Sequence, residues 1–244
     1  MSLENIHVET AASPRNKEGF MEGIKDCVPT LLGYLSIGLA AGVVQKTAGL
    51  SIAEIALMSL ILYAGSAQFI AAGMIAASSS PTAIIITILF VNLRHLLLSA
   101  ALSPYFRHLS PLRNILVGSL LTDETFGVAI NQTAKTKKIN ESWMHGLNIT
   151  AYLNWFIANI AGALLAQWIS DPEKFGLEFA LPAMFIGILV LSIIGRSKIK
   201  RDIAVALVAV VLTVGCSFFL SSSMGIIVAT IIASTLGMAV EKWK

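Results

Sequence analysis

Three long stretches of the chain contain no charged residue, and they constrain the fold more than any other feature. No Asp, Glu, Lys or Arg occurs in residues 55–93, 142–170 or 203–240. A soluble domain needs charged residues at short intervals to keep its surface in water, whereas a membrane-spanning helix needs about 20 mostly apolar residues in a row. With 56% hydrophobic and only 13% charged residues, the chain is expected to be an all-α, polytopic transmembrane helix bundle.

The remaining charges are distributed as in a membrane protein rather than in a nucleic-acid-binding one. The net charge is only +3, and the basic residues lie in short runs between the apolar stretches. With the N-terminus inside, most of these runs fall on one side of the lipid bilayer, which predicts cytoplasmic N- and C-termini. The two cysteines lie far apart and fit no ligand spacing. We therefore expect no metal, no cofactor and no nucleic-acid partner.

The apolar pattern predicts about eight spans, with seven as the alternative. We expect residues 1–26 to form a cytoplasmic segment and residues 27–244 a single transmembrane domain. The expected spans are residues 28–45, 52–78, 82–102, 112–133, 143–169, 179–195, 203–220 and 225–240. The fourth is the least regular, because Asp123 and Glu124 lie at its centre. Two similar small-residue runs, 40–45 and 161–167, leave an internal repeat open.

A polar segment, Tyr63–Phe69, interrupts the second expected span. Gly65, Ser66 and the neighbouring alanines allow two backbones to approach closely, and Gln68 brings an amide into an apolar stretch. A helix broken at this point would present backbone N–H groups to an anion such as a carboxylate. The alternative is a packing face on which Gln68 bonds to a neighbouring helix.

The third expected span contains Asn92-Leu93-Arg94-His95. Asn92 and His95 are three residues apart and share a helix face, whereas Arg94 must find a carboxylate or a water-filled cavity. His95 is a candidate proton carrier, because an unperturbed imidazole titrates near neutral pH. The alternative is a structural ion pair near the outer membrane face, with Arg94 reaching toward the headgroups.

The fourth expected span contains Thr122-Asp123-Glu124-Thr125. Adjacent carboxylates on a helix point in directions about 100° apart, so Asp123 and Glu124 are expected to have different partners. One of them can pair with Arg94, and the other can bind an ammonium group or carry a proton. The alternative is a re-entrant segment whose acids are solvated.

These motifs, in this order, resemble those of the AzlC family, the large subunit of a branched-chain amino-acid exporter. The resemblance covers about residues 19–200. The matching pieces are Gly23, Pro29, Gly38 and Gly42, the segments Ala64–Phe69, Asn92–His95 and Thr122–Glu124, the region of Gly162, and Phe179–Phe185. One departure is Leu96-Leu97-Leu98, where the family often has Leu-Tyr after the Arg-His pair.

The resemblance implies a bacterial inner-membrane permease that works with a small AzlD-type membrane subunit. It also implies proton-driven efflux of leucine, isoleucine, valine or related apolar amino acids, and therefore a protein that is not an enzyme. The substrate-binding candidates are Gly65, Ser66, Gln68, Asn92, Asp123 and Glu124. The candidates for proton coupling or an ion pair are Arg94, His95, Asp123 and Glu124.

Two other classes of function compete with secondary transport. An intramembrane serine hydrolase could use Ser66 and His95, but Gly65-Ser66-Ala67-Gln68 lacks the second glycine of the GxSxG motif. A passive channel, or a membrane scaffold for a partner subunit, would need none of the charged residues at depth. The sequence favours a secondary transporter with alternating access.

Overall fold

The computed structural model describes residues 15–133, 138–169, 199–219 and 222–242, together with single positions between 174 and 190. These residues form helices and no β-strand, which confirms the all-α class. The sixth expected span, residues 179–195, lies largely outside the described residues. Contacts divide the chain into two compact units, Met1–Met184 and Phe185–Lys244.

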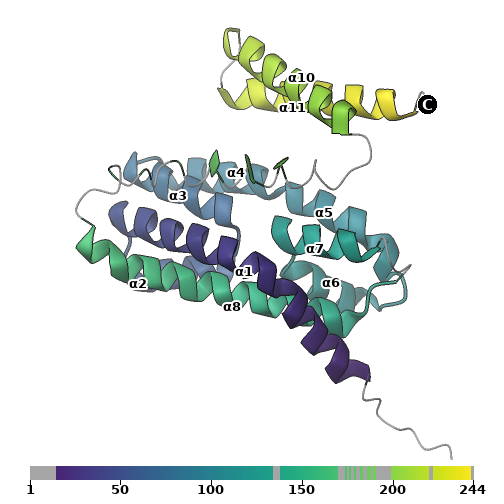
Figure 1. Ribbon diagram of the computed structural model, residues 1–244. Helices are drawn as coiled ribbons and strands as arrows, with labels where there is room; N and C mark the ends of the chain where they lie inside the picture. The colour runs from purple at the N-terminus through teal and green to yellow at the C-terminus, as the bar shows by residue number, and fades with distance from the viewer. Residues whose placement is uncertain are drawn as a thin grey trace, which may run out of the picture. The chain divides into compact units, whose positions relative to one another are not determined.

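The first unit contains a succession of long and short helices (Figure 1). In chain order they are α1 (Arg15–Thr47), α2 (Ile52–Leu57), the π-helical η1 (Met58–Leu62), α3 (Gly65–Ala76), α4 (Pro81–Asn92), α5 (Arg94–Leu102), the 3₁₀ turn η2 (Ser103–Phe106), α6 (Pro111–Ser119), α7 (Asp123–Thr133), α8 (Glu141–Leu165) and the 3₁₀ turn η3 (Ala166–Trp168). The start of α1 at Arg15 shows that part of the expected N-terminal segment is helical.

The second unit contains two helices that pack against each other, α10 (Ile199–Ser217) and α11 (Ser222–Lys242). They run antiparallel, because Gly225 lies beside Cys216 and Gly237 lies beside Val205. Both helices occur where the sequence predicts the seventh and eighth spans.

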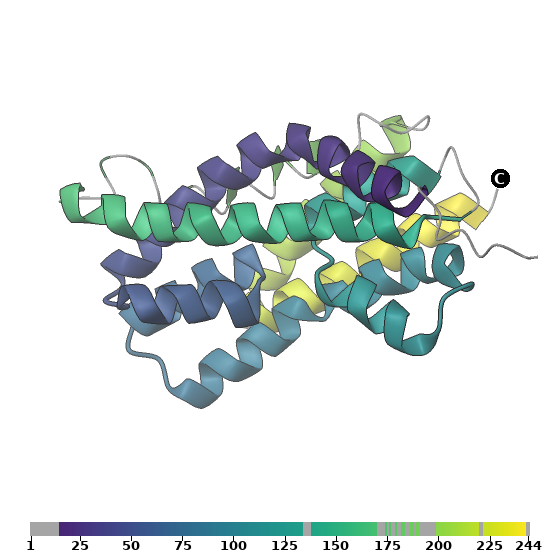
Figure 2. The ribbon, with the colours of Figure 1, turned by 90° about the horizontal axis from the view of Figure 1, so that it is seen from below.

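The first unit is built around α1 and α8, which lie side by side and run parallel (Figures 1 and 2). Glycines allow the two backbones to touch, because a Cβ at any of four positions would overlap a carbonyl of the partner helix. The four contacts are Gly23 on Trp143, Gly146 on Phe20, Gly42 on Asn159, and Gly162 on Leu39. At each end of the pair, a glycine of α1 contacts a carbonyl of α8 and a glycine of α8 contacts a carbonyl of α1. The two helices are therefore related by an approximate local twofold axis.

Among the residues that the structure describes, three helical segments are long and apolar enough to cross a membrane: Gly19–Thr47, Pro81–Phe106 and Glu141–Trp168. The middle segment, α4 to η2, runs opposite to the other two. Its end lies beside the start of α8, since the Ile139 N–H donates to the Tyr105 carbonyl at 3.4 Å. We call the end where α1 and α8 begin the basic end, and the end where they finish the far end.

The segment α2–η1–α3 is a hairpin that enters from the far end and returns to it (Figure 2). The helix breaks at Tyr63, whose φ of 30° is left-handed. One turn into α3, the Gln68 amide donates to the Met58 carbonyl at 3.1 Å, so α3 folds back along η1. Ile75, near the end of α3, shares a surface cavity with Gly49 at the far end. We call this segment the first hairpin.

The segment α6–α7, here the second hairpin, enters from the basic end and returns to it (Figure 1). The Asn148 side chain of α8 donates to the Val117 carbonyl at 2.9 Å and fixes α6 along α8. After a turn at residues 120–122, Thr122 starts α7 by exchanging hydrogen bonds with Thr125. The chain then reaches Ile139 at the basic end shortly after α7 finishes.

The two hairpins correct the expected topology. The second and fourth apolar segments were expected to be straight spans, but each forms two short helical arms that turn back on each other. The returning arms, α3 and α7, have 12 and 11 residues. At about 1.5 Å per residue they reach roughly half of a 30 Å apolar core. The path of the fourth segment fits the re-entrant alternative.

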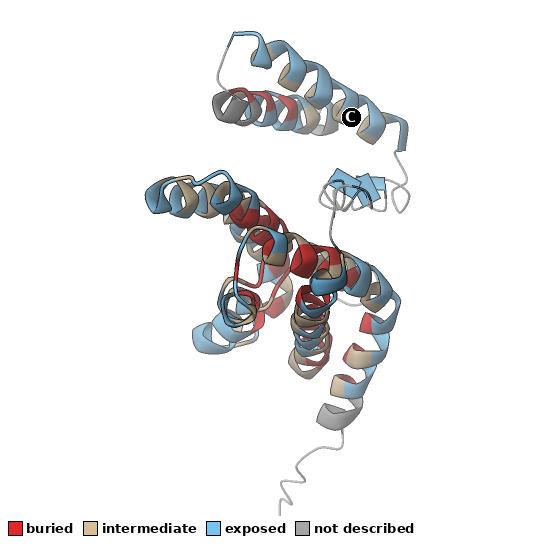
Figure 3. Ribbon diagram, turned by 90° about the vertical axis from the view of Figure 1, so that its left-hand side faces the viewer, coloured by how far each residue is buried: buried red, intermediate tan, exposed pale blue. Residues whose placement is uncertain are grey.

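The corrected topology also redistributes the basic residues. Arg107 and Arg113, which the eight-span pattern places on the outer side, lie at the basic end with Lys25 and Lys138. Arg113 is 3.4 Å from Glu141 at the start of α8. Within residues 19–133 and 138–169, Lys46 is then the single Lys or Arg at the far end, and Arg94 lies at mid-depth. Figure 3 shows buried residues gathered where the helices of this unit face one another.

Candidate functional site

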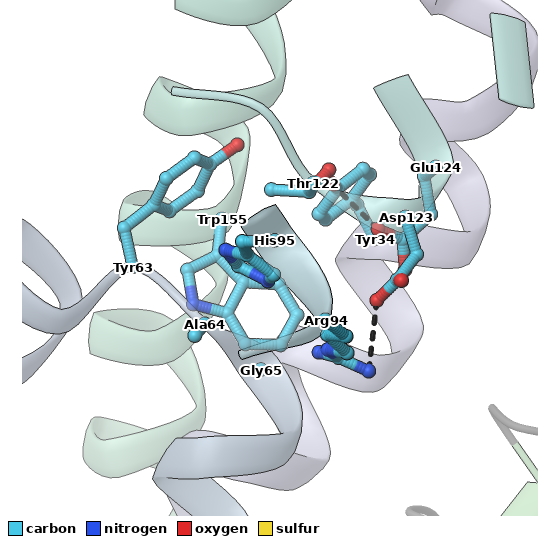
Figure 4. Close-up of a pocket in the computed structure, with 10 residues that line it drawn as sticks. All are labelled: Tyr34, Tyr63, Ala64, Gly65, Arg94, His95, Thr122, Asp123, Glu124 and Trp155. Atoms are coloured by element: carbon cyan, nitrogen blue, oxygen red, sulfur yellow. Dashed lines mark hydrogen bonds and ion pairs between the residues drawn. The ribbon is translucent and has the colours of Figure 1, made fainter. Parts of the chain in front are cut away.

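The tips of the two hairpins meet at mid-depth, beside a break in the crossing segment between α4 and α5. Figure 4 shows the small cavity that they enclose with the α1–α8 pair. Its lining residues are Tyr34, Tyr63, Ala64, Gly65, Arg94, His95, Thr122, Asp123, Glu124 and Trp155. Three motifs that are separated in the sequence are therefore adjacent in space, and each lies at a helix break.

Arg94 joins the two hairpins. Its Nη1 lies 3.0 Å from Asp123 Oδ2 at the start of α7, and its Nη2 donates to Ser66 Oγ at 2.7 Å at the start of α3. A guanidinium suits this task because its rigid fork of donors can serve two acceptors at once. The sequence left open which acid pairs with Arg94; in the structure it is Asp123.

Tyr34 ties the second hairpin to α1. Its hydroxyl donates to Glu124 Oε2 at 2.9 Å and is also hydrogen-bonded to the Thr122 hydroxyl. Tyr34 is 4% exposed, and its ring meets the Trp155 ring edge-on, with 5.7 Å between the centroids. Glu124 thus faces a rigid aromatic layer, whereas Asp123 faces Arg94.

Trp155 of α8 contacts the first hairpin at Gly65 and Gln68. The indole N–H donates to Gln68 Oε1 at 3.1 Å, while the Gln68 amide donates to Met58 across the hairpin. A Cβ on Gly65 would lie 2.9 Å from the Trp155 ring, so the start of α3 rests directly on the indole. Gln68 is fully buried and uses both ends of its amide in these contacts.

Opposite electrostatic features meet in the cavity. The N-terminus of α3 begins at Gly65, and Ala64 supplies no side-chain cap, so this helix end presents partial positive charge and N–H donors. The N-terminus of α7 carries two acids, Asp123 and Glu124, in its first turn. The cavity therefore combines an anion-attracting side with an acidic side.

The cavity is closed in this conformation. Its volume is about 10 Å³, which holds about one water molecule and no amino acid. Larger cavities lie beside each hairpin: one of about 460 Å³ next to α6, and one of about 410 Å³ next to α2 and α3. Leu121 and Ser99 line the first of these and adjoin the site residues Thr122 and His95.

The structure gathers most of the predicted site residues but not all of them. Gly65, Arg94, His95, Asp123 and Glu124 line the cavity, and Ser66 accepts a hydrogen bond from Arg94 without lining it. Gln68 and Asn92 are not among the lining residues. In the described part of the chain, neither Asn92 Oδ1 nor His95 Nε2 has a hydrogen-bond partner, although both atoms are buried.

Two site residues, Tyr34 and Trp155, are not among the candidates predicted from the sequence. A hydroxyl or indole N–H in the middle of an apolar span is a usable signal, because a buried polar group needs a partner.

Three asparagines of α8 form hydrogen bonds to neighbouring helices. Asn148 binds α6, Asn154 donates to the Leu31 carbonyl of α1 at 3.2 Å, and Asn159 accepts from Gln45 of α1 at 2.7 Å. They hold the α1–α8 pair and the second hairpin in place around the cavity.

The fold and the site define a helical membrane protein whose buried site lies between broken helices at mid-depth. The model of the family described as AzlC protein matches residues 29–169, which contain all three motifs and both hairpins. The chain belongs to the AzlC family.

Several curated proteins are similar over most of the chain. "Inner membrane protein YgaZ" of Escherichia coli is 32% identical over 179 residues, which are 71% of this chain and 73% of that protein. An "Uncharacterized membrane protein" of Helicobacter pylori is 28% identical over 87% of this chain and 95% of its own length. "Branched-chain amino acid transport protein AzlC" of Bacillus subtilis is 26% identical over 77% of this chain and 76% of its own length. No solved structure matches the chain.

Proposed function

We propose that this protein is a secondary transporter that exports branched-chain or related apolar amino acids in exchange for protons. The observation that carries the proposal is the closed, bipolar cavity between two half-membrane hairpins. A zwitterion needs a cationic and an anionic partner, and the cavity offers both within one small volume. The name of the Bacillus subtilis relative, a branched-chain amino acid transport protein, supports the substrate class.

The substrate carboxylate is assigned to the start of α3. The backbone N–H groups of Gly65 and Ser66 lie at an uncapped helix end, and Arg94 lies beside them. Helix N-termini bind anions through these donors and the helix dipole. The substrate ammonium is assigned to the acidic side of the cavity, where Asp123 and Glu124 begin α7.

The remaining candidate residues have supporting roles in this proposal. Gln68 keeps the first hairpin folded back through its hydrogen bonds to Met58 and Trp155. In this proposal it does not contact the substrate directly. Asn92 and His95, on either side of the break between α4 and α5, offer a buried amide oxygen and a buried imidazole nitrogen without partners among the described residues. They can bind the substrate or exchange a proton once the cavity opens.

The hairpins provide a path for alternating access. A cavity with space for about one water must widen before an amino acid enters. Moving the tip of the first hairpin would open the site toward the far end, and moving the tip of the second would open it toward the basic end. The parallel α1–α8 pair stays fixed, because its glycine contacts leave no space for sliding.

The setting is proposed to be the bacterial cytoplasmic membrane, with the basic end and both termini in the cytoplasm. The concentration of Lys and Arg at one end of the first unit supports this orientation. A small AzlD-type subunit is the proposed partner. None of the residues of α4 is buried, and Ile85, Leu89 and Phe90 are more than half exposed, so this helix needs a cover of lipid or partner.

Efflux of labelled leucine or valine from loaded cells, with and without the small subunit, tests the proposal. The wild-type protein should give saturable efflux that depends on the pH gradient. An Asp123→Asn, Glu124→Gln double variant should abolish it, whereas Glu22→Gln, on the exposed side of α1, should not. Normal efflux by the double variant would refute the site assignment, and non-saturable flux that ignores the pH gradient would favour a passive channel.

A further inference from the structure

The two adjacent acids of α7 have different surroundings. Asp123 is paired with Arg94 at 3.0 Å. Glu124 receives a hydrogen bond from the neutral Tyr34 hydroxyl at 2.9 Å, and no ion pair joins it to a described Lys, Arg or His. The positive charge of Arg94 is thus already neutralised by Asp123, and no cationic side chain among the described residues pairs with an ionised Glu124.

The titratable and charged groups around Glu124 come from every element that closes the cavity. They are Tyr34 from α1, Tyr63 from the first hairpin, Arg94 and His95 from α5, and Asp123 from α7. From α8 the cavity receives Trp155, which does not titrate. An unpaired charge in such a place costs several kcal/mol, so the Glu124 carboxyl must bind a proton or an external cation.

We propose that Glu124 is the exchange residue of this transporter: its carboxyl holds a proton when the site is empty and the substrate ammonium when the site is occupied. The proposal rests on the transport function proposed above and assigns its coupling to one side chain. On substrate entry the O–H bond of the Glu124 carboxyl breaks, the proton passes to water, and the carboxylate then accepts hydrogen bonds from the ammonium. One carboxyl cannot hold both cations at once, so amino-acid binding expels the proton.

The geometry supplies the other parts of the exchange. The cavity of about 10 Å³ has space for about one water, which can accept the released proton. Tyr34 is a positioning residue, because it fixes the Glu124 carboxyl and belongs to the rigid α1–α8 pair. Arg94 and Asp123 neutralise each other in this conformation and leave the net charge of the site to Glu124.

Proton release on substrate binding tests the proposal directly. Purified full-length protein in weakly buffered detergent solution is mixed with leucine, and a pH-indicator dye reports the protons released. The wild-type protein should release about one proton per bound leucine. Glu124→Gln should release none, Glu124→Asp should restore the release, and Glu22→Gln, on the exposed side of α1, should retain it. Release that disappears with His95→Gln and persists with Glu124→Gln would overturn the assignment.

Tyr34→Phe separates positioning from packing, because it removes one hydroxyl and keeps the ring. The pH midpoint of proton release should shift upward, since the ionised carboxylate loses a hydrogen-bond donor. A change in thermal stability with an unchanged midpoint would limit Tyr34 to a structural role and contradict the positioning argument.

Infrared difference spectra of the substrate-free protein provide a readout without transport. A protonated-carboxyl band should be present in the wild-type protein and absent from Glu124→Gln, with Glu22→Gln as the matched control. A band that persists in Glu124→Gln overturns the proton assignment. If the band behaves as expected but no apolar amino acid binds or moves, the transport function fails while the protonated Glu124 stands.

Discussion

Arg94 Nη1 and Asp123 Oδ2 lie 3.0 Å apart and join the crossing segment to the tip of the second hairpin. The same guanidinium binds Ser66 of the first hairpin, so this one side chain holds both hairpin tips closed. The pair neutralises two of the charges in the cavity and thereby sets the charge balance of the site.

Breaking this pair should weaken the closed state. Arg94→Ala or Asp123→Asn leaves one charge at depth without its partner, which costs about 2–5 kcal/mol in buried pairs. The loss should fall in the lower part of that range, because the two side chains keep 22% and 17% of their exposure. Thermal unfolding in detergent measures the effect. The exchanged pair, Arg94→Asp with Asp123→Arg, should recover part of the stability but not the Ser66 contact.

The matched control for this experiment is the Arg113–Glu141 pair. Its atoms are 3.4 Å apart, and Arg113 is 63% exposed. Removing it with Arg113→Ala should cost no more than about 1 kcal/mol. Equal losses from the two pairs would show that Arg94 and Asp123 do not close the site.

Gly65→Ala should impair transport. Alanine favours a helix over glycine by about 1 kcal/mol, but here its Cβ would lie 2.9 Å from the Trp155 ring. Overpacking of this kind costs about 1–3 kcal/mol and would displace the start of α3. The initial rate of labelled-leucine efflux is the measurement. Gly73→Ala, in the same helix with open space around it, should leave the rate unchanged.

The α1–α8 pair should tolerate no side chain at its contact glycines. Gly42→Ala would force a Cβ into the Asn159 carbonyl and separate the two helices, with a loss of about 1–3 kcal/mol or more. Gly33→Ala, on the same helix, has nothing within 4 Å of its Cβ and should be neutral. The measurement is the unfolding temperature of each variant in detergent. Equal unfolding temperatures for Gly42→Ala and Gly33→Ala would contradict the close backbone contact.

Gln68 and Trp155 should be energetically coupled. Gln68→Leu removes the partner of the Trp155 indole N–H, and a buried group left unsatisfied costs about 1–3 kcal/mol. The Met58 carbonyl keeps the hydrogen bond from the Tyr63 N–H at 3.3 Å. Trp155→Phe removes the indole N–H from the other side. A double-mutant cycle on thermal stability should give a coupling of about 0.5–3 kcal/mol. Additive losses would mean that the hydrogen bond does not support the hairpin.

Thiol labelling tests the re-entrant topology. In a background with Cys27→Ser and Cys216→Ser, single cysteines at the exposed positions Ser110 and Lys138 should react with an impermeant reagent from the same side of the membrane. A cysteine in place of Thr47 should react from the opposite side. Eight full spans would instead separate Ser110 from Lys138, so labelling from opposite sides refutes the hairpins.

A local signal for one of the hairpins was present in the sequence. Thr122 followed by two acids and Thr125 is typical of a helix start, because Thr caps the first turn and acids favour the positive helix end. Taken only as charges at depth, the same residues were placed at the centre of a span. No comparable signal indicated that α3 folds back on η1, since the Gln68–Met58 contact exists only after the chain has turned.

The sequence by itself determined that this protein lies in a lipid bilayer and that its secondary structure is helical. Uncharged apolar stretches of this length are stable in a lipid bilayer. Because the bilayer core has no water, their backbone N–H and C=O groups must form hydrogen bonds within the helix itself. It also located the three motifs that lie at depth. The tertiary structure alone decided that two apolar segments are hairpins, that Asp123 rather than Glu124 pairs with Arg94, and that Tyr34 and Trp155 complete the site. The physical reason is that an apolar segment is stable in lipid either as one straight helix or as a helical hairpin. Which side chains pair, in contrast, depends on how segments that are far apart in the sequence are placed in space.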